Sequence, residues 1–130
     1  MQHGVEKQRF TLRKFEILRK KKLIQELFEN GSSFFLYPYK IFYYPTSNLE
    51  NNQVLFSVSK KNFKNASTRN LIKRRLREAY RLNKHQLTIG QNNIYYCLAI
   101  VYISKFVMPY QEIEPKLIEV LRRLNNIEEN

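Results

Sequence analysis

A strongly basic segment from Ser57 to Lys84 is the feature that most constrains how this chain can fold. It holds ten Lys or Arg residues and one acid, Glu78, so it carries +9 of the chain's net charge of +12. Neither Gly nor Pro follows Ser67 before Gly90, and Ser67 and Thr68 are candidate N-caps, which predicts a helix that begins here. A helix of this composition can pack one side on a core and present a row of cations to phosphates.

The two sides of this predicted helix differ in chemistry. At about 100° per residue, one arc holds most of the cations, together with Asn70: Arg69, Lys73, Arg74, Arg77, Arg81 and Lys84. The opposite arc is apolar: Leu71, Ile72, Leu76, Ala79 and Leu82, with Arg75 as the exception. A solvated surface helix is the alternative interpretation. Such helices usually mix charge signs, because opposite charges four residues apart stabilise them. The near absence of acids therefore favours a polyanionic partner.

Length and composition set broad bounds. The chain has 130 residues, which predicts one domain at 10–127 after a flexible N-terminal tail at 1–9 that lacks an apolar pattern. No stretch approaches the 18 to 20 apolar residues of a membrane span, and the N-terminus has no apolar core of a signal peptide. Cys97 is the single cysteine, so an internal disulfide and a cysteine-based metal cluster are excluded. We expect a cytoplasmic protein whose partner is a nucleic acid first and a membrane surface second.

The N-terminal part predicts a helix followed by two strands. Apolar residues recur at helical spacing and end at a helix-stop signal: Leu23, Ile24, Leu27 and Phe28, then Asn30 and Gly31. The next segment is rich in aromatic residues, and Pro38 splits it into a short strand and a longer strand from Tyr39 to Tyr44, which Pro45 ends. One face of these strands must meet the helices. The other can stack unpaired bases, or it can be covered by a second layer or a partner.

The remaining pattern is a strand, the basic helix, a strand and a last helix. Gln53–Ser59 alternates Val54, Phe56 and Val58 on one face, and it delivers Lys60 and Lys61 beside the basic helix. The nearly continuous apolar run 94–104 suits a central strand covered on both faces. The order strand–helix–strand predicts a parallel βαβ unit. The last helix, from about Gln111, has one packing stripe: Ile113, Leu117, Val120, Leu121 and Leu124.

The string SVSKK, followed by RNLIKRRLRE and then YR, resembles the protein subunit of bacterial ribonuclease P. That family has an Arg-Asn-x-x-Lys-Arg-x-x-Arg pattern on a basic helix after a strand that ends in Lys-Lys. Five residues match this pattern position for position: Arg69, Asn70, Lys73, Arg74 and Arg77. The resemblance covers roughly residues 10–125 and extends more weakly to Phe28 and Gly31. It implies a protein that binds RNA and takes part in removing the 5′ leader of precursor tRNA.

The resemblance also implies a fold and a set of site residues. The fold is α+β, a single-domain α/β sandwich with a three- to four-stranded sheet, three helices and a left-handed βαβ crossover that carries the basic helix. Charge pattern and resemblance together give these candidate RNA contacts: Lys60, Lys61, Lys64, Arg69, Asn70, Lys73, Arg74, Arg77 and Arg81.

In this family the N-terminal helix lines a cleft for the leader, which implies leader contacts at Ile24, Phe28 and Phe42. Ile24 stands where the family often has an aromatic residue, and a slip of one residue would move the strand contact to Tyr43, on the opposite face. From the residues alone, plain core packing is the default role for Ile24 and Phe28.

The residues argue against a catalytic site in the protein. Cleavage of a phosphodiester needs a base and an acid, or carboxylates that hold metal ions. The chain has no Asp, and Glu78 is the only acid between Glu50 and Glu112. A mechanism with two histidines would need His3 in the tail to meet His85. We therefore expect no catalytic or metal-binding residue in the protein, an accessory subunit of a ribonucleoprotein endoribonuclease, and Mg²⁺ held by the catalytic RNA subunit, as the resemblance implies.

Three interpretations stay open at this point. The first is the ribonuclease P protein subunit, whose partners are the catalytic RNA subunit and precursor tRNA, with neither membrane nor DNA. The second is a ribosomal or other structural RNA-binding protein with a similar α/β fold. The third is a DNA-binding regulator that places the basic helix in a major groove, which would require a dimer and a helix-turn-helix pair.

Overall fold

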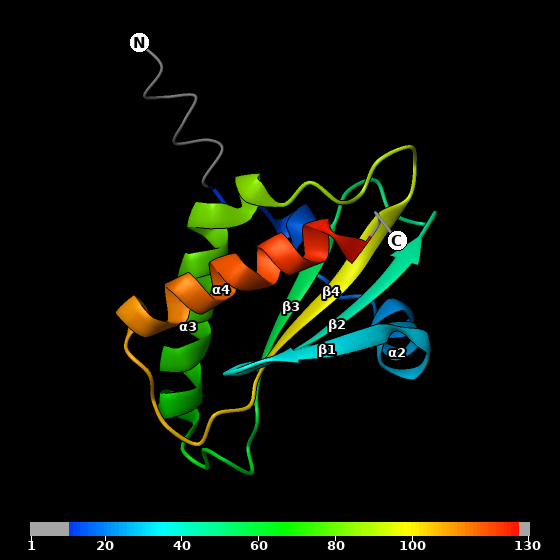
Figure 1. Ribbon diagram of the computed structural model, residues 1–130. Helices are drawn as coiled ribbons and strands as arrows, with labels where there is room; N and C mark the ends of the chain where they lie inside the picture. The colour runs from blue at the N-terminus through cyan, green and yellow to red at the C-terminus, as the bar shows by residue number, and fades with distance from the viewer. Residues whose placement is uncertain (1–10, 128–130) are drawn as a thin grey trace.

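The protein is an α+β structure in which three helices pack on a four-stranded mixed sheet (Figure 1). This computed structural model describes residues 11–127, so the tail expected at 1–9, including His3, lies outside the described residues. The elements in chain order are η1 (Lys14–Glu16), α2 (Lys21–Asn30), β1 (Ser32–Leu36), β2 (Tyr39–Thr46), β3 (Gln53–Val58), α3 (Ala66–Asn83), η2 (Lys84–Gln86), β4 (Tyr95–Tyr102) and α4 (Tyr110–Asn125).

The sheet has the strand order β1-β2-β4-β3. β3 runs parallel to β4, whereas β1–β2 and β2–β4 are antiparallel. The predicted central strand is confirmed, because β4 lies between two neighbours and residues 96–100 are all buried. The parallel βαβ unit is confirmed as β3–α3–β4. The left-handed sense that the resemblance implies for this crossover stays a prediction.

The helices cover the two faces of the sheet unequally. α3 and α4 lie together on one face, where they bury the alternating residues Val54, Phe56 and Val58 of β3. The predicted stripe of α4 is confirmed, since all five of its residues are buried. The hydroxyl of Tyr39 donates to the carbonyl of Ile113 at 2.8 Å and so ties β2 to α4. The short helix α2 lies on the other face, with Leu23 and Leu27 over Cys97.

Three local predictions need correction or a different reason. The N-cap of α3 is Asn65, whose side chain accepts from the backbone N–H of Ser67 at 3.2 Å, so the candidate caps Ser67 and Thr68 lie inside the first turn. β2 continues through Pro45 to Thr46; pairing with β1 ends at Tyr43, so Pro45 has a neighbouring strand on one side only, where a missing N–H is tolerated.

Gly31 does end α2, but its φ is −75°, within the ordinary range for any residue. The need for glycine there comes from close approach of the backbone. A Cβ on Gly31 would lie 2.3 Å from the carbonyl oxygen of Leu27 and 2.9 Å from that of Tyr43. The glycine thus lets the end of α2 sit directly against β2.

Candidate nucleic-acid interface

Helix α3 separates its apolar and charged sides as its sequence predicts. Its buried residues are Ile72, Leu76, Ala79, Tyr80 and Asn83, which contact β3 and α4. Asn70, Arg74 and Arg77 are exposed, and Lys73 is half-buried. Arg75, the exception in the apolar arc, donates from Nη1 to the carbonyl of Met108 at 2.7 Å. Arg75 therefore fixes the segment that leads into α4, which explains a cation on that side.

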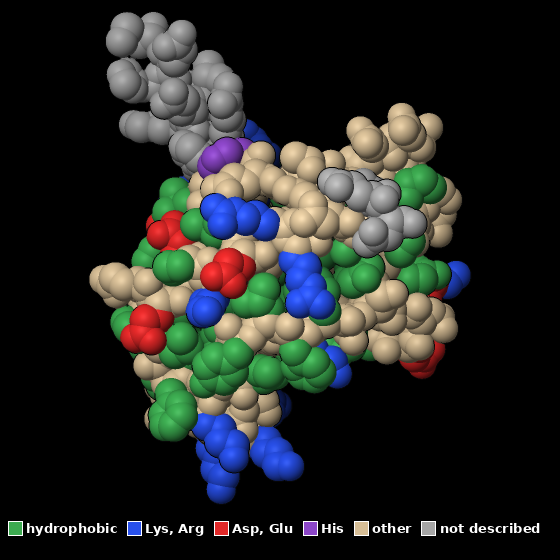
Figure 2. Space-filling model, in the orientation of Figure 1, with side chains coloured by type: hydrophobic (Ala, Val, Ile, Leu, Met, Phe, Trp, Pro, Cys, Tyr) green, Lys and Arg blue, Asp and Glu red, His purple; other side chains and the backbone are tan. Residues whose placement is uncertain are grey.

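The loop between β3 and α3 presents three exposed lysines, Lys60, Lys61 and Lys64. Figure 2 shows Lys and Arg side chains gathered at the lower end of the molecule, where Figure 1 places this loop and the start of α3. The backbone N–H of Lys61 donates to Ser59 Oγ at 3.1 Å, and the cap at Asn65 closes the loop. The backbone that carries the three lysines is thus fixed next to the basic helix.

Arg69 is built into this loop. Its Nη1 donates to the carbonyls of Phe63 at 2.8 Å and of Lys64 at 2.9 Å. Guanidinium hydrogen bonds of this kind orient the group as well as the backbone that it contacts. Of the nine candidate RNA contacts, Arg69 therefore has a structural role that the sequence pattern did not indicate.

The cations of α3 fall into two groups. Arg81 forms an ion pair with Glu78 at 2.7 Å. Lys84, just after α3, donates to both carboxylate oxygens of Glu16 at 2.7 and 2.8 Å. Within residues 11–127, Lys73, Arg74 and Arg77 form no ion pair; Arg77 instead lies 6.0 Å from the ring centroid of Phe56. Among the cations of α3, these three are available to phosphates, as are the three exposed lysines of the preceding loop.

The three predicted leader contacts meet on the face of the sheet that α2 covers. Phe28 on α2 is 41% exposed, and its ring lies 4.7 Å from that of Phe42 on β2 at an interplanar angle of 66°. Ile24 and Phe42 are partly buried against the small core beneath α2. Tyr43 points to the other layer, with its ring 6.1 Å from Phe34. The register therefore places Phe42, and not Tyr43, beside Phe28.

Two further residues extend this patch, which we call the aromatic surface: Phe28, Phe35, Lys40 and Phe42. Lys40 Nζ lies 5.0 Å from the ring centroids of both Phe35 and Phe42. The ring of Phe35 is 63% exposed. The sequence analysis missed both residues. A signal was available, because Lys40 and Phe42 share a face by alternation, and the hairpin register sets Phe35 opposite Lys40.

The titratable groups of this interface favour binding over proton transfer. The Arg81 guanidinium, which donates to the carboxylate of Glu78, lowers the pKa of that group, so it stays ionised near neutral pH. Glu78 is thus paired with Arg81 in the folded protein. Burial raises the pKa of the Cys97 thiol to about 11. Within residues 11–127 no group of three or more His, Cys, Asp or Glu side chains is placed to hold a metal ion.

No helix in the described part of the chain has the length and apolar character needed to cross a membrane.

Comparison with known proteins identifies the family. The family model described as ribonuclease P matches residues 12–125. The chain belongs to the ribonuclease P protein family. It is 34% identical over 119 residues to the ribonuclease P protein component of Porphyromonas gingivalis strain W83, covering 88% of this chain and 87% of the relative. It is 43% identical over 106 residues to the ribonuclease P protein component of Chlorobium phaeobacteroides, covering 72% and 73%.

Solved ribonuclease P proteins have the same fold. The Thermotoga maritima protein matches with a TM-score of 0.69 at 21% identity, covering 83% of this chain and 96% of that one. A 2.0 Å structure of the Staphylococcus aureus protein matches with a TM-score of 0.66 at 23% identity, covering 83% and 94%. At this identity the likeness concerns the fold. Family membership supports the first of the three interpretations: a protein subunit of ribonuclease P, with RNA binding implied by the family.

Proposed function

We propose that this subunit binds the catalytic RNA subunit of ribonuclease P through its basic helix and the preceding loop, and the 5′ leader of precursor tRNA through its aromatic surface. One observation carries the proposal. On α3, Lys73, Arg74 and Arg77 form no ion pair in residues 11–127, whereas the exposed ring of Phe28 and the partly buried ring of Phe42 meet on the opposite face of the sheet. Unpaired RNA is recognised by stacking on such rings, and folded RNA by contacts to its phosphates.

In this proposal the protein positions RNA and the RNA subunit performs cleavage with its Mg²⁺ ions. Glu78, the acid within the basic segment, is ionised and paired with Arg81, so it is a poor general acid near neutral pH. Two-metal cleavage also needs several carboxylates to hold the ions. The protein itself then binds no cofactor, and the complex works in the cytoplasm without a membrane or DNA partner.

The leader contact is tested in the assembled ribonucleoprotein. Phe28→Ala removes one stacking ring, which should weaken precursor binding by about 1 to 3 kcal/mol and leave binding of mature tRNA unchanged, since mature tRNA has no leader. Phe106→Ala is the matched control, because its ring is 73% exposed and lies after β4, away from α2. An equal loss for both RNAs would instead assign Phe28 to core packing.

The location of the chemistry is tested by cleavage assays on RNA-free protein. We expect no 5′ processing by wild type at any Mg²⁺ concentration, and processing by both wild type and Glu78→Gln once the RNA subunit is added. Processing by protein alone that is abolished in Glu78→Gln would refute the assignment of catalysis to RNA.

A further inference from the structure

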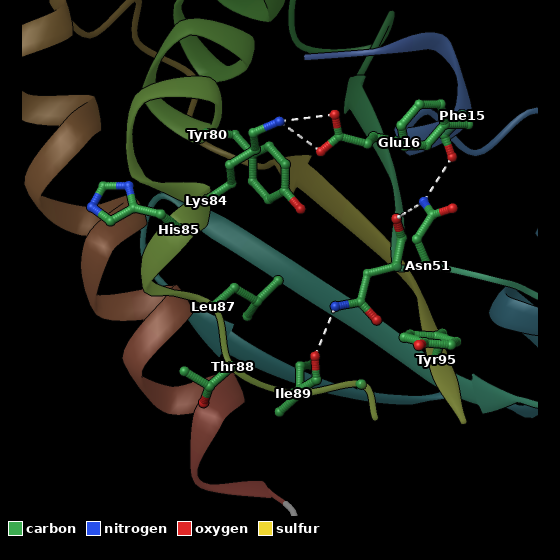
Figure 3. Close-up of a pocket in the computed structure, with 12 residues that line it drawn as sticks. Phe15, Glu16, Asn51, Tyr80, Lys84, His85, Leu87, Thr88, Ile89 and Tyr95 are labelled. Carbon is green, nitrogen blue, oxygen red and sulfur yellow. Dashed lines mark hydrogen bonds and ion pairs between the residues drawn. The ribbon is translucent and has the colours of Figure 1, made fainter. Parts of the chain in front are cut away.

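A separate cavity of about 440 Å³ lies where the end of α3, η1, the segment just before β3 and the segment after η2 meet (Figure 3). We call it the Tyr80 cavity, after the side chain whose hydroxyl reaches into it. Its volume is within the range of about 300 to 1,000 Å³ typical of small-molecule sites. The residues of the aromatic surface do not line it. It is therefore a different place from the one proposed for the leader.

The walls of the cavity are fixed by hydrogen bonds. Asn52 Nδ2 donates to the carbonyl of Ile89 at 2.8 Å, and Asn52 Oδ1 accepts from the backbone N–H of Tyr96 at 2.9 Å. Gly90 has a φ of +92°, and a Cβ there would lie 2.4 Å from Asn52 Oδ1, so glycine alone fits this turn. Asn51 Nδ2 donates to the carbonyl of Phe15 at 2.8 Å. A cavity with fixed walls costs little ordering when a ligand binds.

The hydroxyl of Tyr80 is one of the polar groups that line the cavity. The side chain of Tyr80 is 4% exposed, and its ring packs edge-on against Phe56 with centroids 5.7 Å apart. In Figure 3 its hydroxyl points into the cavity, and within residues 11–127 the hydroxyl makes no hydrogen bond. Burial raises the pKa of Tyr80, so the phenol keeps its proton and can donate. The hydroxyl oxygen is open to the cavity, so a ligand bound there can accept its hydrogen bond in place of water.

The remaining lining suits a flat aromatic ligand. Figure 3 places the rings of Phe15 and Tyr95 across the cavity from Leu87 and Tyr80. Phe15 is 57% exposed, although it is anchored through its backbone carbonyl. The same ring also lines a second hollow, of about 360 Å³, whose charged lining residues are Arg19, Lys20 and Glu50. The ring of Phe15 thus lies between the cavity that contains the Tyr80 hydroxyl and a hollow that contains two cations and one acid.

We propose that the Tyr80 cavity binds an unpaired nucleobase. The base would stack against Phe15, accept a hydrogen bond from the Tyr80 hydroxyl at a ring nitrogen or carbonyl oxygen, and direct its phosphate toward Arg19 and Lys20. A nucleobase has two apolar faces and a polar edge, which matches rings on one side and a donor on the other. The base can come from an RNA strand or from a free nucleotide, because both present the same chemistry.

The test uses the full-length protein without an RNA subunit, so its outcome is independent of the leader assay. The backbone amide signals of the protein are followed by NMR during titration with 5′-AMP, with a single-stranded hexaadenylate, and with ribose 5-phosphate, which lacks the base. We expect shifts at residues 87–90 and at Tyr95 with one or both base-containing ligands, and none there with ribose 5-phosphate. Shifts with AMP assign a site open to free nucleotides, and shifts with hexaadenylate alone assign a strand-binding site.

Variants separate the two contacts. Tyr80→Phe removes the donor alone and should weaken binding about 2- to 10-fold, as expected for one hydrogen bond. Phe15→Ala removes an exposed ring and should weaken binding about 5-fold or more. Phe106→Ala is the control with an exposed ring elsewhere, and it should bind as wild type does.

Equal shifts with AMP and ribose 5-phosphate would overturn the proposal, as would shifts confined to the aromatic surface. Because Phe15 is exposed, its variant keeps the test valid even if Tyr80→Phe does not fold.

Discussion

The two faces of the sheet have the same strands but very different covers. On one face, α3 and α4 bury a large core in which Ile41, Leu98 and Ile100 have no exposed surface. On the other face, the ten-residue helix α2 covers a core of five buried residues in the described chain, and Phe42 and Leu55 stay partly exposed. The second face is therefore only partly covered.

This difference shows how one sheet can serve both stability and binding. A strand that is buried on both faces must be apolar throughout, as β4 is. A strand whose second face is partly open can carry rings and a cation there, as β2 does with Phe42 and Lys40. The proposed leader contacts lie on the partly covered face, at the edge of the small core beneath α2. The cations proposed for the RNA subunit lie on the outer side of α3, whose inner side packs on the main core.

The largest expected effect separates the two faces by stability. Leu98→Ala deletes a fully buried side chain beneath α3 and α4 and should cost about 2 to 5 kcal/mol in the free energy of unfolding. Phe28→Ala deletes a ring that is 41% exposed and should cost about 1 kcal/mol. Urea unfolding of both variants measures this difference. Equal costs would mean that α2 and its ring belong to the core as fully as β4 does.

The sequence could predict the features of this fold that repeat along an element, but not single contacts between distant elements. Periodicity gave the strands, the α4 stripe and the charged arc of α3, because side chains on one face of an element repeat at a fixed spacing. It could not give contacts made by single side chains over long distances. Arg75 bonding Met108 and Lys84 bonding Glu16 both depend on how elements cross in space.

The candidate site also had some residues that the sequence could indicate and others that only the structure shows. Phe28 and Phe42 could be named because a resemblance supplied their roles, and the register then placed them together. Phe35 and Lys40 lie in the same patch but were not recognised, since an exposed ring and a lysine on a strand are ordinary surface residues in isolation. The Tyr80 cavity had no sequence signal, because it is assembled from three segments that are far apart in the chain, within 15–16, 51–52 and 80–95.

The next effect distinguishes structural from binding cations on α3. Arg69→Ala removes two hydrogen bonds from a charged donor to the loop carbonyls and should cost about 1.5 to 3 kcal/mol in the free energy of unfolding. Lys73→Ala removes a half-buried cation without an ion pair in the described chain and should change stability by less than about 0.5 kcal/mol. Chemical denaturation checks both values. If Arg69→Ala were as stable as wild type, the Arg69 guanidinium would not support the loop, and the distinction between structural and binding cations would fail.

A smaller effect tests whether the unpaired cations meet phosphates. Arg77→Ala should reduce the slope of log K against log salt by about 0.7 to 0.9 for binding to the RNA subunit, because one counterion fewer is released. Arg122→Ala is the control, since Arg122 is exposed near the end of α4, away from the charged arc. Filter-binding titrations at several salt concentrations give both slopes. A slope for Arg77→Ala that matches wild type would remove Arg77 from the interface.

The smallest effect concerns the paired cation of α3 and its dependence on pH. Arg81 lowers the pKa of Glu78 in the folded state, so this interaction contributes its full stability above the ordinary pKa of 4.5 and loses it as pH falls through the lowered value. Both side chains are solvent-exposed to a third or more, so solvent screening limits the contribution to about 0.2 to 0.5 kcal/mol.

Glu78→Gln should be less stable than wild type by this amount at pH 7, and the difference should vanish near pH 3. Glu119→Gln, at an exposed site without an ion pair in residues 11–127, should show no such pH-dependent difference. A difference for Glu78→Gln that persists at pH 3 would mean that packing, and not the charge of Glu78, holds Arg81 on the helix.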